Sequence, residues 1–266
     1  MKRKYSEKEI HHFVESAKSD GFVILRNHLN PEKIRQWRET SQPLLDRQIK
    51  LEGNETSRGS NRYYVSFPFE MPFADPEFYE DGDILAIVEG LVGKRFVMCQ
   101  LASDTPLKGS VYQDIHRDCP PLFPEEGIET PMFQLAVNFP LVDVTPENGP
   151  LEIIRGTHML SRDQGLDLVE SNKAKIEQLE MKAGDVLIRD VRTLHRGTPN
   201  HTDVPRPMVV LGYSRSWLHR PEVSINIPRE EYEKLSPNAK AMLRFNPIVD
   251  EIDRELKPES YTVFQY

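Results

Sequence analysis

The chain has 266 residues, 38% of them hydrophobic, which suits one large core, and we expect a single domain over residues 1–266. The net charge of −8 is spread along the sequence without a basic patch, and no apolar run approaches the roughly 20 residues that span a bilayer, which argues against nucleic-acid and membrane partners. Two cysteines, Cys99 and Cys119, are too few for a disulfide framework, and the start MKRKYSEKEI lacks an apolar secretory region, so we expect a cytoplasmic protein.

The first predicted element is an amphipathic helix that follows Ser6. Ser6 is a good N-cap residue, and Glu9 three positions later completes a capping-box pattern. Gly21 ends the pattern. The apolar residues recur at helical spacing, at Ile10, Phe13, Val14 and Ala17.

Residues 22–94 continue with a strand and two further helices. FVILR predicts the strand, Asn30-Pro31 opens the next helix, and DILAIVEGLVG predicts another helix that ends at Gly93. The segment 52–78 between these helices is polar at first and then rich in proline and aromatic residues. We interpret residues 1–94 as helical support with a long loop, and residues 52–76 either form a lid over a site or an ordinary surface excursion.

From Arg95 onward the residue pattern consists of short β-like runs without intervening helices. This pattern favours a sandwich or jelly roll over residues 95–217. The turns between them are marked by ENGP at 147–150 and KAGD at 182–185. Residues 218–266 form a C-terminal extension, predicted to be helical at 227–245. The sequence therefore predicts a mainly β core with flanking helices.

His116 and Asp118 form a His-x-Asp pair after a strand-like segment. In an extended strand, side chains two residues apart project from the same face, so both can reach one metal ion. A second pair, His201 and Asp203, lies among Pro199, Asn200 and Pro205, where a turn is the better prediction.

A metal site needs a third donor from elsewhere in the chain. Two imidazoles and one carboxylate on one side of an octahedron are typical of non-haem Fe(II) oxygenases. The candidates are His158, His195 and His219. We favour His195, because it ends the turn-strand pattern KAGDVLIRDVRTLHRG, which would deliver it to the core.

The chain resembles the phytanoyl-CoA dioxygenase-like family of Fe(II)/2-oxoglutarate-dependent oxygenases. The similar stretches are DGFVILRNHLNPEKIRQWR, the His-Arg-Asp motif, LVDVTPENGPLEIIRGTH, KAGDVLIRDVRTLHRGTPN, and Arg206, eleven residues beyond His195. The resemblance implies a double-stranded β-helix, the cupin-like jelly roll. It also implies that His116, Asp118 and His195 bind Fe(II), with 2-oxoglutarate and O2 as co-substrates.

The same resemblance implies a set of co-substrate residues. Arg206 would pair with the far carboxylate of 2-oxoglutarate, for which a planar guanidinium is well suited. Thr198 is a candidate hydroxyl partner near the same end. In MFQLAVNFP, Asn138 lies opposite the apolar side, so we expect it inside the barrel near the co-substrate, with Gln100 on a neighbouring strand.

Two features separate this chain from relatives. The family usually has Pro-Gly-Ser-His where this chain has RGTH at 155–158, so Arg155 adds a charge that serves either a substrate anion or a surface ion pair. Related halogenases have a small residue at the position of Asp118. The retained aspartate therefore favours a hydroxylase.

The resemblance implies an enzyme that hydroxylates an aliphatic C–H bond of a small soluble metabolite and releases succinate and CO2. One alternative is a cupin-type metal enzyme, an oxygenase or isomerase, that does not use 2-oxoglutarate. Another is a non-catalytic jelly-roll binding protein. The candidates for contact with the substrate are Arg117, Arg155, Arg215 and Trp217.

Overall fold

The N-terminal helix forms as its sequence predicts. The computed structural model describes residues 3–127, 129–220 and 223–252. Helix α1 (Glu7–Asp20) starts at Ser6, whose hydroxyl accepts from the Glu9 amide while the Glu9 side chain accepts from the Ser6 amide. It ends at Gly21, where φ is +85° and a Cβ would lie 2.5 Å from the Thr193 hydroxyl. Only glycine suits this conformation and this close approach.

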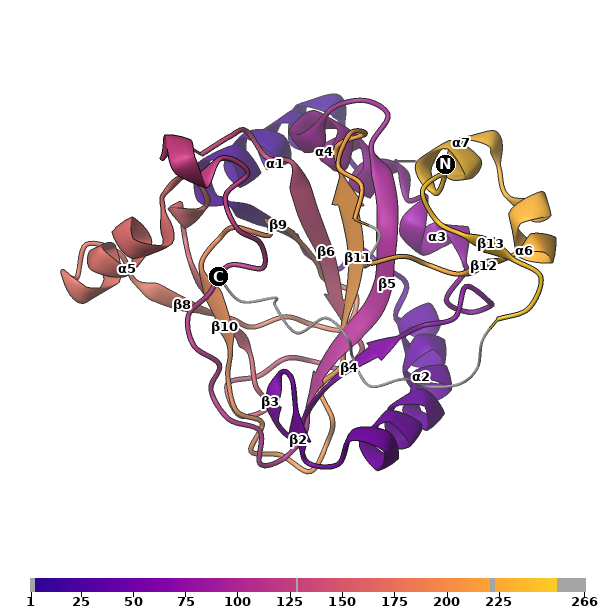
Figure 1. The fold of residues 1–266 in the computed structure, drawn as a ribbon, viewed down its shortest axis with the longest axis horizontal. Helices are drawn as coiled ribbons and strands as arrows, with labels where there is room; N and C mark the ends of the chain where they lie inside the picture. The colour runs from indigo at the N-terminus through magenta and orange to yellow at the C-terminus, as the bar shows by residue number, and fades with distance from the viewer. Residues whose placement is uncertain (1–2, 128, 221–222, 253–266) are drawn as a thin grey trace.

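Two antiparallel sheets form the β core (Figure 1). The large sheet contains, in spatial order, β1 (Phe22–Leu25), β9 (Val186–Asp190), β6 (Gln134–Pro140), β11 (Met208–Ser214), β5 (Val97–Pro106) and β4 (Arg62–Ser66). The small sheet contains β10 (His195–Gly197), β7 (Leu151–Ile154) and β8 (Ile176–Leu179). Phe22 and Leu187 of the large sheet pack with Ile153 and Leu179 of the small sheet, so the two sheets face each other.

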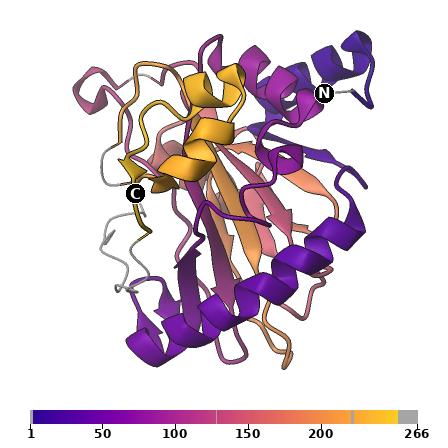
Figure 2. The same cartoon turned by 90° about the vertical axis from the view of Figure 1, so that its right-hand side faces the viewer.

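Helices cover the outer face of the large sheet. The long helix α2 (Pro31–Glu52) lies across it (Figure 2), and α4 (Gly82–Val92) packs beside α1. Trp37 of α2 is fully buried, and its ring centroid lies 5.2 Å from that of Phe139 on β6. Burial of such aromatic surface is the main force that fixes the helix on the sheet.

The segment 52–78 is not one long loop, which corrects the sequence interpretation. Residues 62–66 form strand β4 at the edge of the large sheet. Phe67 and Phe73 are buried and pack on Trp37, at centroid distances of 5.8 and 5.0 Å. The aromatic half of this segment is therefore core, and the polar half contains a short hairpin of β2 (Glu55–Thr56) and β3 (Gly59–Ser60).

The remaining elements are short. They are α3 (Pro76–Tyr79), η1 (Pro124–Glu126), η2 (Thr157–Met159), α5 (Arg162–Glu170), β12 (Ile227–Pro228), α6 (Arg229–Lys234), α7 (Pro237–Met242) and β13 (Ile248–Val249). The helix expected at 227–245 is two helices, because Ser236 caps a new one whose first residue is proline. In the part of the chain that is described, no helix is long and apolar enough to cross a membrane.

The inner face of the large sheet carries small and polar side chains. Gln100, Gly212, Ala136 and Arg189 lie opposite one another in register on β5, β11, β6 and β9. Residues opposite each other in an antiparallel pair project to the same side. The face of the large sheet that borders the space between the sheets therefore has small residues at its centre and polar groups on either side of them.

Candidate metal centre

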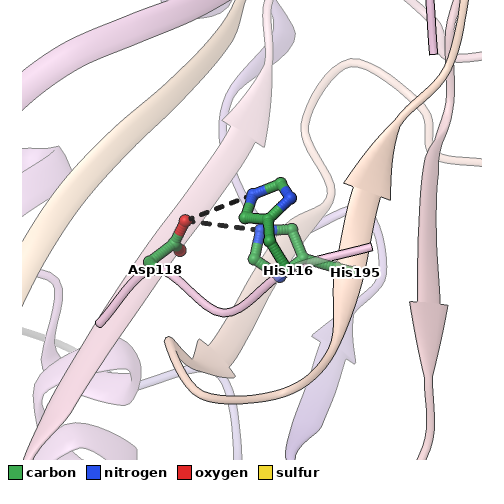
Figure 3. A group of neighbouring side chains, drawn as sticks. All are labelled: His116, Asp118 and His195. Carbon is green, nitrogen blue, oxygen red and sulfur yellow. Dashed lines mark ion pairs between the residues drawn. The ribbon is translucent and has the colours of Figure 1, made fainter. Parts of the chain in front are cut away.

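His116, Asp118 and His195 meet at one end of the space between the sheets (Figure 3). His195 begins β10, and His116 lies opposite it in an isolated antiparallel bridge. The amide of each histidine donates to the carbonyl of the other, at 2.9 and 3.1 Å. Backbone pairing thus brings together two residues that are far apart in the sequence.

The donor atoms of the three side chains are close enough to share one ion. Asp118 Oδ1 lies 3.4 Å from His195 Nε2 and 3.8 Å from His116 Nε2. Donors on adjacent octahedral positions, each about 2.1 Å from a metal, lie about 3 Å apart. All three ligand atoms lie within 4.8 Å of one another, so a small inward movement would complete the site.

Both imidazoles are held with Nε2 directed at the carboxylate. His116 Nδ1 lies 2.7 Å from the Asp114 carbonyl, and His195 Nδ1 lies 2.8 Å from the Thr193 carbonyl. A carbonyl accepts only, so Nδ1 carries the proton and donates. Nε2 of each ring then presents the lone pair that a metal requires.

Burial and charge keep His116 and Asp118 in the states that bind metal. Burial, with a smaller contribution from His195, lowers the pKa of His116 to about 3. Burial would raise the pKa of Asp118, but Arg189 and the two histidines hold it well below its ordinary value of 3.8. Asp118 is therefore ionised and His116 neutral at neutral pH.

Arg189 is a residue of this centre that the sequence analysis missed. It projects from the inner face of β9, and its Nη2 lies 2.6 Å from Asp118 Oδ2. This leaves Oδ1 as the oxygen that faces the histidines. Its Nε and Nη1 are buried with no hydrogen-bond partner among the described residues.

A buried positive charge lies further along the inner space, around Arg206 and Arg62. Arg206 donates through Nη2 to the Gly149 carbonyl at 2.6 Å. Arg62 pairs with Asp104 at 2.9 Å and donates to the Thr198 carbonyl. Burial lowers the pKa of Arg206 to about 10, with Asp104 opposing and Arg62 adding to the shift, so the guanidinium stays charged at neutral pH. Arg58 also acts on Asp104, so the guanidiniums outnumber this one carboxylate and leave positive charge for an anion to balance. Arg62 was also missed.

The other expected co-substrate residues lie on or near the same inner space. Asn138 is buried on β6 and donates to the Val209 carbonyl at 3.0 Å, while its Oδ1 has no partner in the described parts of the chain. Gln100 donates to the Tyr64 hydroxyl at 2.6 Å. The Thr198 hydroxyl donates to the Pro150 carbonyl at 2.7 Å, and the Thr198 carbonyl accepts from Arg62.

Two of the four candidate substrate residues are engaged in ion pairs elsewhere. Arg117 projects away from its neighbours His116 and Asp118 and pairs with Glu129 at 2.6 Å, in a buried position. Arg155 lies on the surface, pairs with Asp20 and Glu177, and stacks on the Phe22 ring. The structure thus favours the surface ion pair that the sequence left as one alternative for Arg155.

Arg215 and Trp217 follow the end of β11. Arg215 donates through Nε to the Met132 carbonyl at 2.8 Å. Trp217 is 58% exposed, and its ring lies 6.4 Å from that of Phe133, which packs in one cluster with Cys119. Cys119 follows Asp118 in the chain, so Trp217 is linked to the ligand segment through Phe133.

The remaining histidines that the sequence raised lie outside this centre. His158 is buried, with Nε2 3.1 Å from the Lys18 carbonyl, and His219 packs against the Phe245 ring. Asp203, from the second His-x-Asp pair, forms an exposed ion pair with Lys108. These placements agree with the preference for His195 as the distal donor.

A second group of possible donors, His28, Asp81 and Asp83, serves a structural purpose. Asp81 Oδ1 accepts from the amides of Asp83 and Ile84, at the start of α4, and lies 3.0 Å from His28 Nε2. Asp83 accepts from the amides of residues 4 and 5. These oxygens cap a helix and anchor the N-terminal segment.

Comparisons with known proteins agree with the geometry. Dioxygenase aneA of Aspergillus aculeatus is 29% identical over 248 residues, covering 86% of this chain and 80% of the relative. The iron/alpha-ketoglutarate-dependent dioxygenase ausO of Aspergillus calidoustus is 28% identical over 145 residues, covering 53% and 48%. The solved structure of the epimerase SnoN with Fe3+, alpha ketoglutarate and nogalamycin RO has a TM-score of 0.61 at 19% identity, covering 79% of this chain and 85% of that one.

The structural likeness confirms the expected jelly-roll fold with flanking helices. The model of the phytanoyl-CoA dioxygenase family matches residues 17–208, a span that includes His116, Asp118, His195 and Arg206. The family resemblance inferred from the motifs is thereby confirmed: the chain belongs to the phytanoyl-CoA dioxygenase family.

Proposed function

We propose that the protein is an Fe(II)- and 2-oxoglutarate-dependent oxygenase that hydroxylates an aliphatic C–H bond of a small-molecule metabolite. The observation that carries this proposal is the convergence of His116 Nε2, His195 Nε2 and Asp118 Oδ1 on one point. The relative named as an iron/alpha-ketoglutarate-dependent dioxygenase supports the choice of metal and co-substrate.

The three side chains would hold Fe(II) from one side and leave three positions open. Bound there with 2-oxoglutarate, the iron would supply the oxidising chemistry, and the protein would supply placement and charge. Arg189 keeps Asp118 oriented so that one oxygen faces the ion. The Nδ1 hydrogen bonds prevent either ring from turning its protonated nitrogen inward.

Arg206 would bind the far carboxylate of 2-oxoglutarate. The unbalanced charge of Arg206 and Arg62 against Asp104 supports this role, because an uncompensated buried cation is costly until an anion arrives. It also argues against a cupin-type enzyme without 2-oxoglutarate, which has no need of this charge. We propose that Asn138 and Gln100 border the co-substrate from the inner face of the sheet.

We propose hydroxylation over halogenation because Asp118 is present as a donor and occupies the position that a halide would need. The relatives named dioxygenase support an oxidative outcome, whereas the structure named an epimerase shows that one fold serves different reactions. We propose that Trp217, which lies beside Phe133, contacts a small substrate.

Succinate formation tests the proposal. Anaerobically purified protein mixed with Fe(II), 2-oxoglutarate and air should release succinate, and Asp118→Ala should reduce the yield to background. Asp203→Ala, the exposed acid of the other His-x-Asp pair, is the matched control and should behave like wild type. Wild-type protein that forms no more succinate than Asp118→Ala would refute the proposed activity.

A further inference from the structure

Glu129 joins two arginines that lie beside the metal ligands. Its Oε1 lies 2.6 Å from Arg117 Nη1, and its Oε2 lies 3.0 Å from Arg192 Nη1. The Glu129 side chain is 8% exposed, and both arginines are fully buried. A carboxylate that uses both oxygens on two different guanidiniums fixes the distance between them.

Each of these arginines belongs to a segment that carries ligands. Arg117 stands between His116 and Asp118, and Arg192 precedes His195 by three residues. Arg117 also donates through Nε to the Arg192 carbonyl at 3.3 Å. A fixed distance between the two guanidiniums is therefore a fixed distance between the two ligand segments.

The group is balanced in charge and well supplied with hydrogen bonds. Asp190 binds Arg192 through both oxygens, at 3.0 and 2.6 Å, and the Thr130 carbonyl accepts from Arg192 Nη1 at 2.8 Å. Two guanidiniums and two carboxylates sum to zero charge. Removing one carboxylate leaves a buried cation uncompensated, and such groups reorganise.

Other contacts also tie the ligand segments, among them the His116–His195 bridge and the bond from the Asp118 amide to the Val191 carbonyl at 2.9 Å. Arg189 Nη2 pairs with Asp118 Oδ2, and the Gln113 side chain accepts from the Gly197 amide. Glu129 adds a tie through side chains on the side away from the ligand atoms. It also anchors the far end of the segment that leaves Asp118 through Cys119 and the half-exposed Phe123.

We propose that Glu129 is a positioning residue of the metal centre. Its carboxylate holds the His116–Asp118 segment and the His195 segment at the separation that the ion requires, before any ion binds. This inference rests on the proposed metal-binding function, but the tie itself exists in the metal-free protein and is tested there as well.

The test compares Glu129→Gln, Glu129→Asp and the control Glu125→Gln. Gln keeps the shape but loses the charge, Asp keeps the charge but is one methylene shorter, and Glu125 is exposed on the same segment. Co(II) titrations should give a dissociation constant raised at least tenfold in Glu129→Gln, less in Glu129→Asp, and within twofold of wild type in Glu125→Gln. A merely destabilised protein would show a lower thermal midpoint without this graded order.

Imidazole nitrogen NMR of the metal-free proteins supplies the second measurement. The His116 and His195 resonances should shift in both Glu129 variants and stay in place in Glu125→Gln. Wild-type affinity together with unshifted imidazoles in a folded Glu129→Gln would overturn the inference, and if that variant does not fold, the same result in Glu129→Asp would do so. Wild-type protein that binds no Co(II) would refute the metal function, whereas shifted imidazoles would still support the tie.

Discussion

A backbone carbonyl close by in the sequence sets the tautomer of each ligand imidazole. Each Nδ1 faces the carbonyl two residues earlier in the sequence, Asp114 for His116 and Thr193 for His195. The same local geometry therefore recurs at both histidines and needs no residue from elsewhere. Any backbone change at these two carbonyls would release the rings to rotate.

Arg206→Gln should weaken 2-oxoglutarate binding by about 10- to 100-fold. The variant loses a charge-assisted pair, for which about 1.5–3 kcal/mol is typical, and 1.4 kcal/mol is about tenfold in affinity. The measurement is an anaerobic titration of Fe(II)-loaded protein with 2-oxoglutarate, followed by calorimetry. Arg155→Gln removes a surface arginine and serves as the control. An unchanged affinity of Arg206→Gln for 2-oxoglutarate would show that Arg206 does not bind the co-substrate.

The metal-free protein should lose stability as the pH falls below about 6.5, in part through His116. Its pKa is about 3 in the folded protein against an ordinary 6.5, so between these values the unfolded chain binds a proton that the folded one does not. The unfolding free energy then falls by up to about 1.4 kcal/mol per pH unit for this group.

Denaturant titrations of wild type and His116→Gln from pH 7 to pH 5 measure this effect. The difference in unfolding free energy between wild type and His116→Gln should become smaller as the pH falls, since the variant has no imidazole to protonate at this position. If the difference in unfolding free energy between wild type and His116→Gln does not change with pH, the His116 imidazole has the same pKa in the folded and unfolded chain.

Single site residues were predictable where their spacing in the sequence is short enough to fix how their side chains lie relative to one another. His116 and Asp118 follow from the two-residue period of an extended chain, and Arg206 from its offset from His195 within a family motif. Arg189 and Arg62 were missed because their partners, Asp118 and Asp104, are 71 and 42 positions away in the sequence. No local pattern marks a long-range ion pair.

Among the elements, helix α2 depends on one side chain more than on its cap. Trp37→Ala should cost about 3–5 kcal/mol of unfolding free energy, because it leaves a cavity among the aromatic rings between the helix and the large sheet. Denaturant unfolding measures the loss. Trp217→Ala, at an exposed tryptophan, should change stability by no more than about 0.5 kcal/mol. Equal losses in both variants would contradict the packing described for Trp37.

Elements with caps and a clear period were predictable, and those fixed by distant contacts were not. Ser6 and Gly21 bound α1 as expected. Strand β4 was assigned to a loop because proline and aromatic residues follow it, yet pairing with β5 fixes it in the sheet. Helix α5 was not anticipated: it is short, and Gly165 within it packs so closely on Leu194 that a Cβ would lie 2.4 Å away.

At the scale of the whole molecule, metal binding should stabilise the fold. A ligand present at 100 times its dissociation constant adds about 2.7 kcal/mol to the unfolding free energy when it binds only the folded state. Co(II) should therefore raise the thermal midpoint of wild type and of Asp203→Ala, and leave Asp118→Ala unchanged. A rise of equal size in Asp118→Ala would place the ion elsewhere in the protein.

The arrangement of the two sheets was predictable only as a class. Short strands without intervening helices indicate a sandwich or jelly roll, but not which strands are neighbours. The large sheet takes β1 and β4 from the region before Arg95, which the sequence had assigned to helical support. Chain topology depends on which apolar faces pack together, and that information is spread over the whole sequence.

The paired amides of His116 and His195 allow separation of the two ligand segments to be followed by hydrogen exchange. Each of these two N–H groups is protected from solvent only while β10 and the segment around residue 116 stay side by side. His116 and His195 would together hold the ion and so join the same two stretches, and a rearrangement that separated these stretches would expose both amides. The rate of deuterium uptake at these two amides would then follow the rate of metal release. The amides of β6 and β11 would exchange slowly throughout.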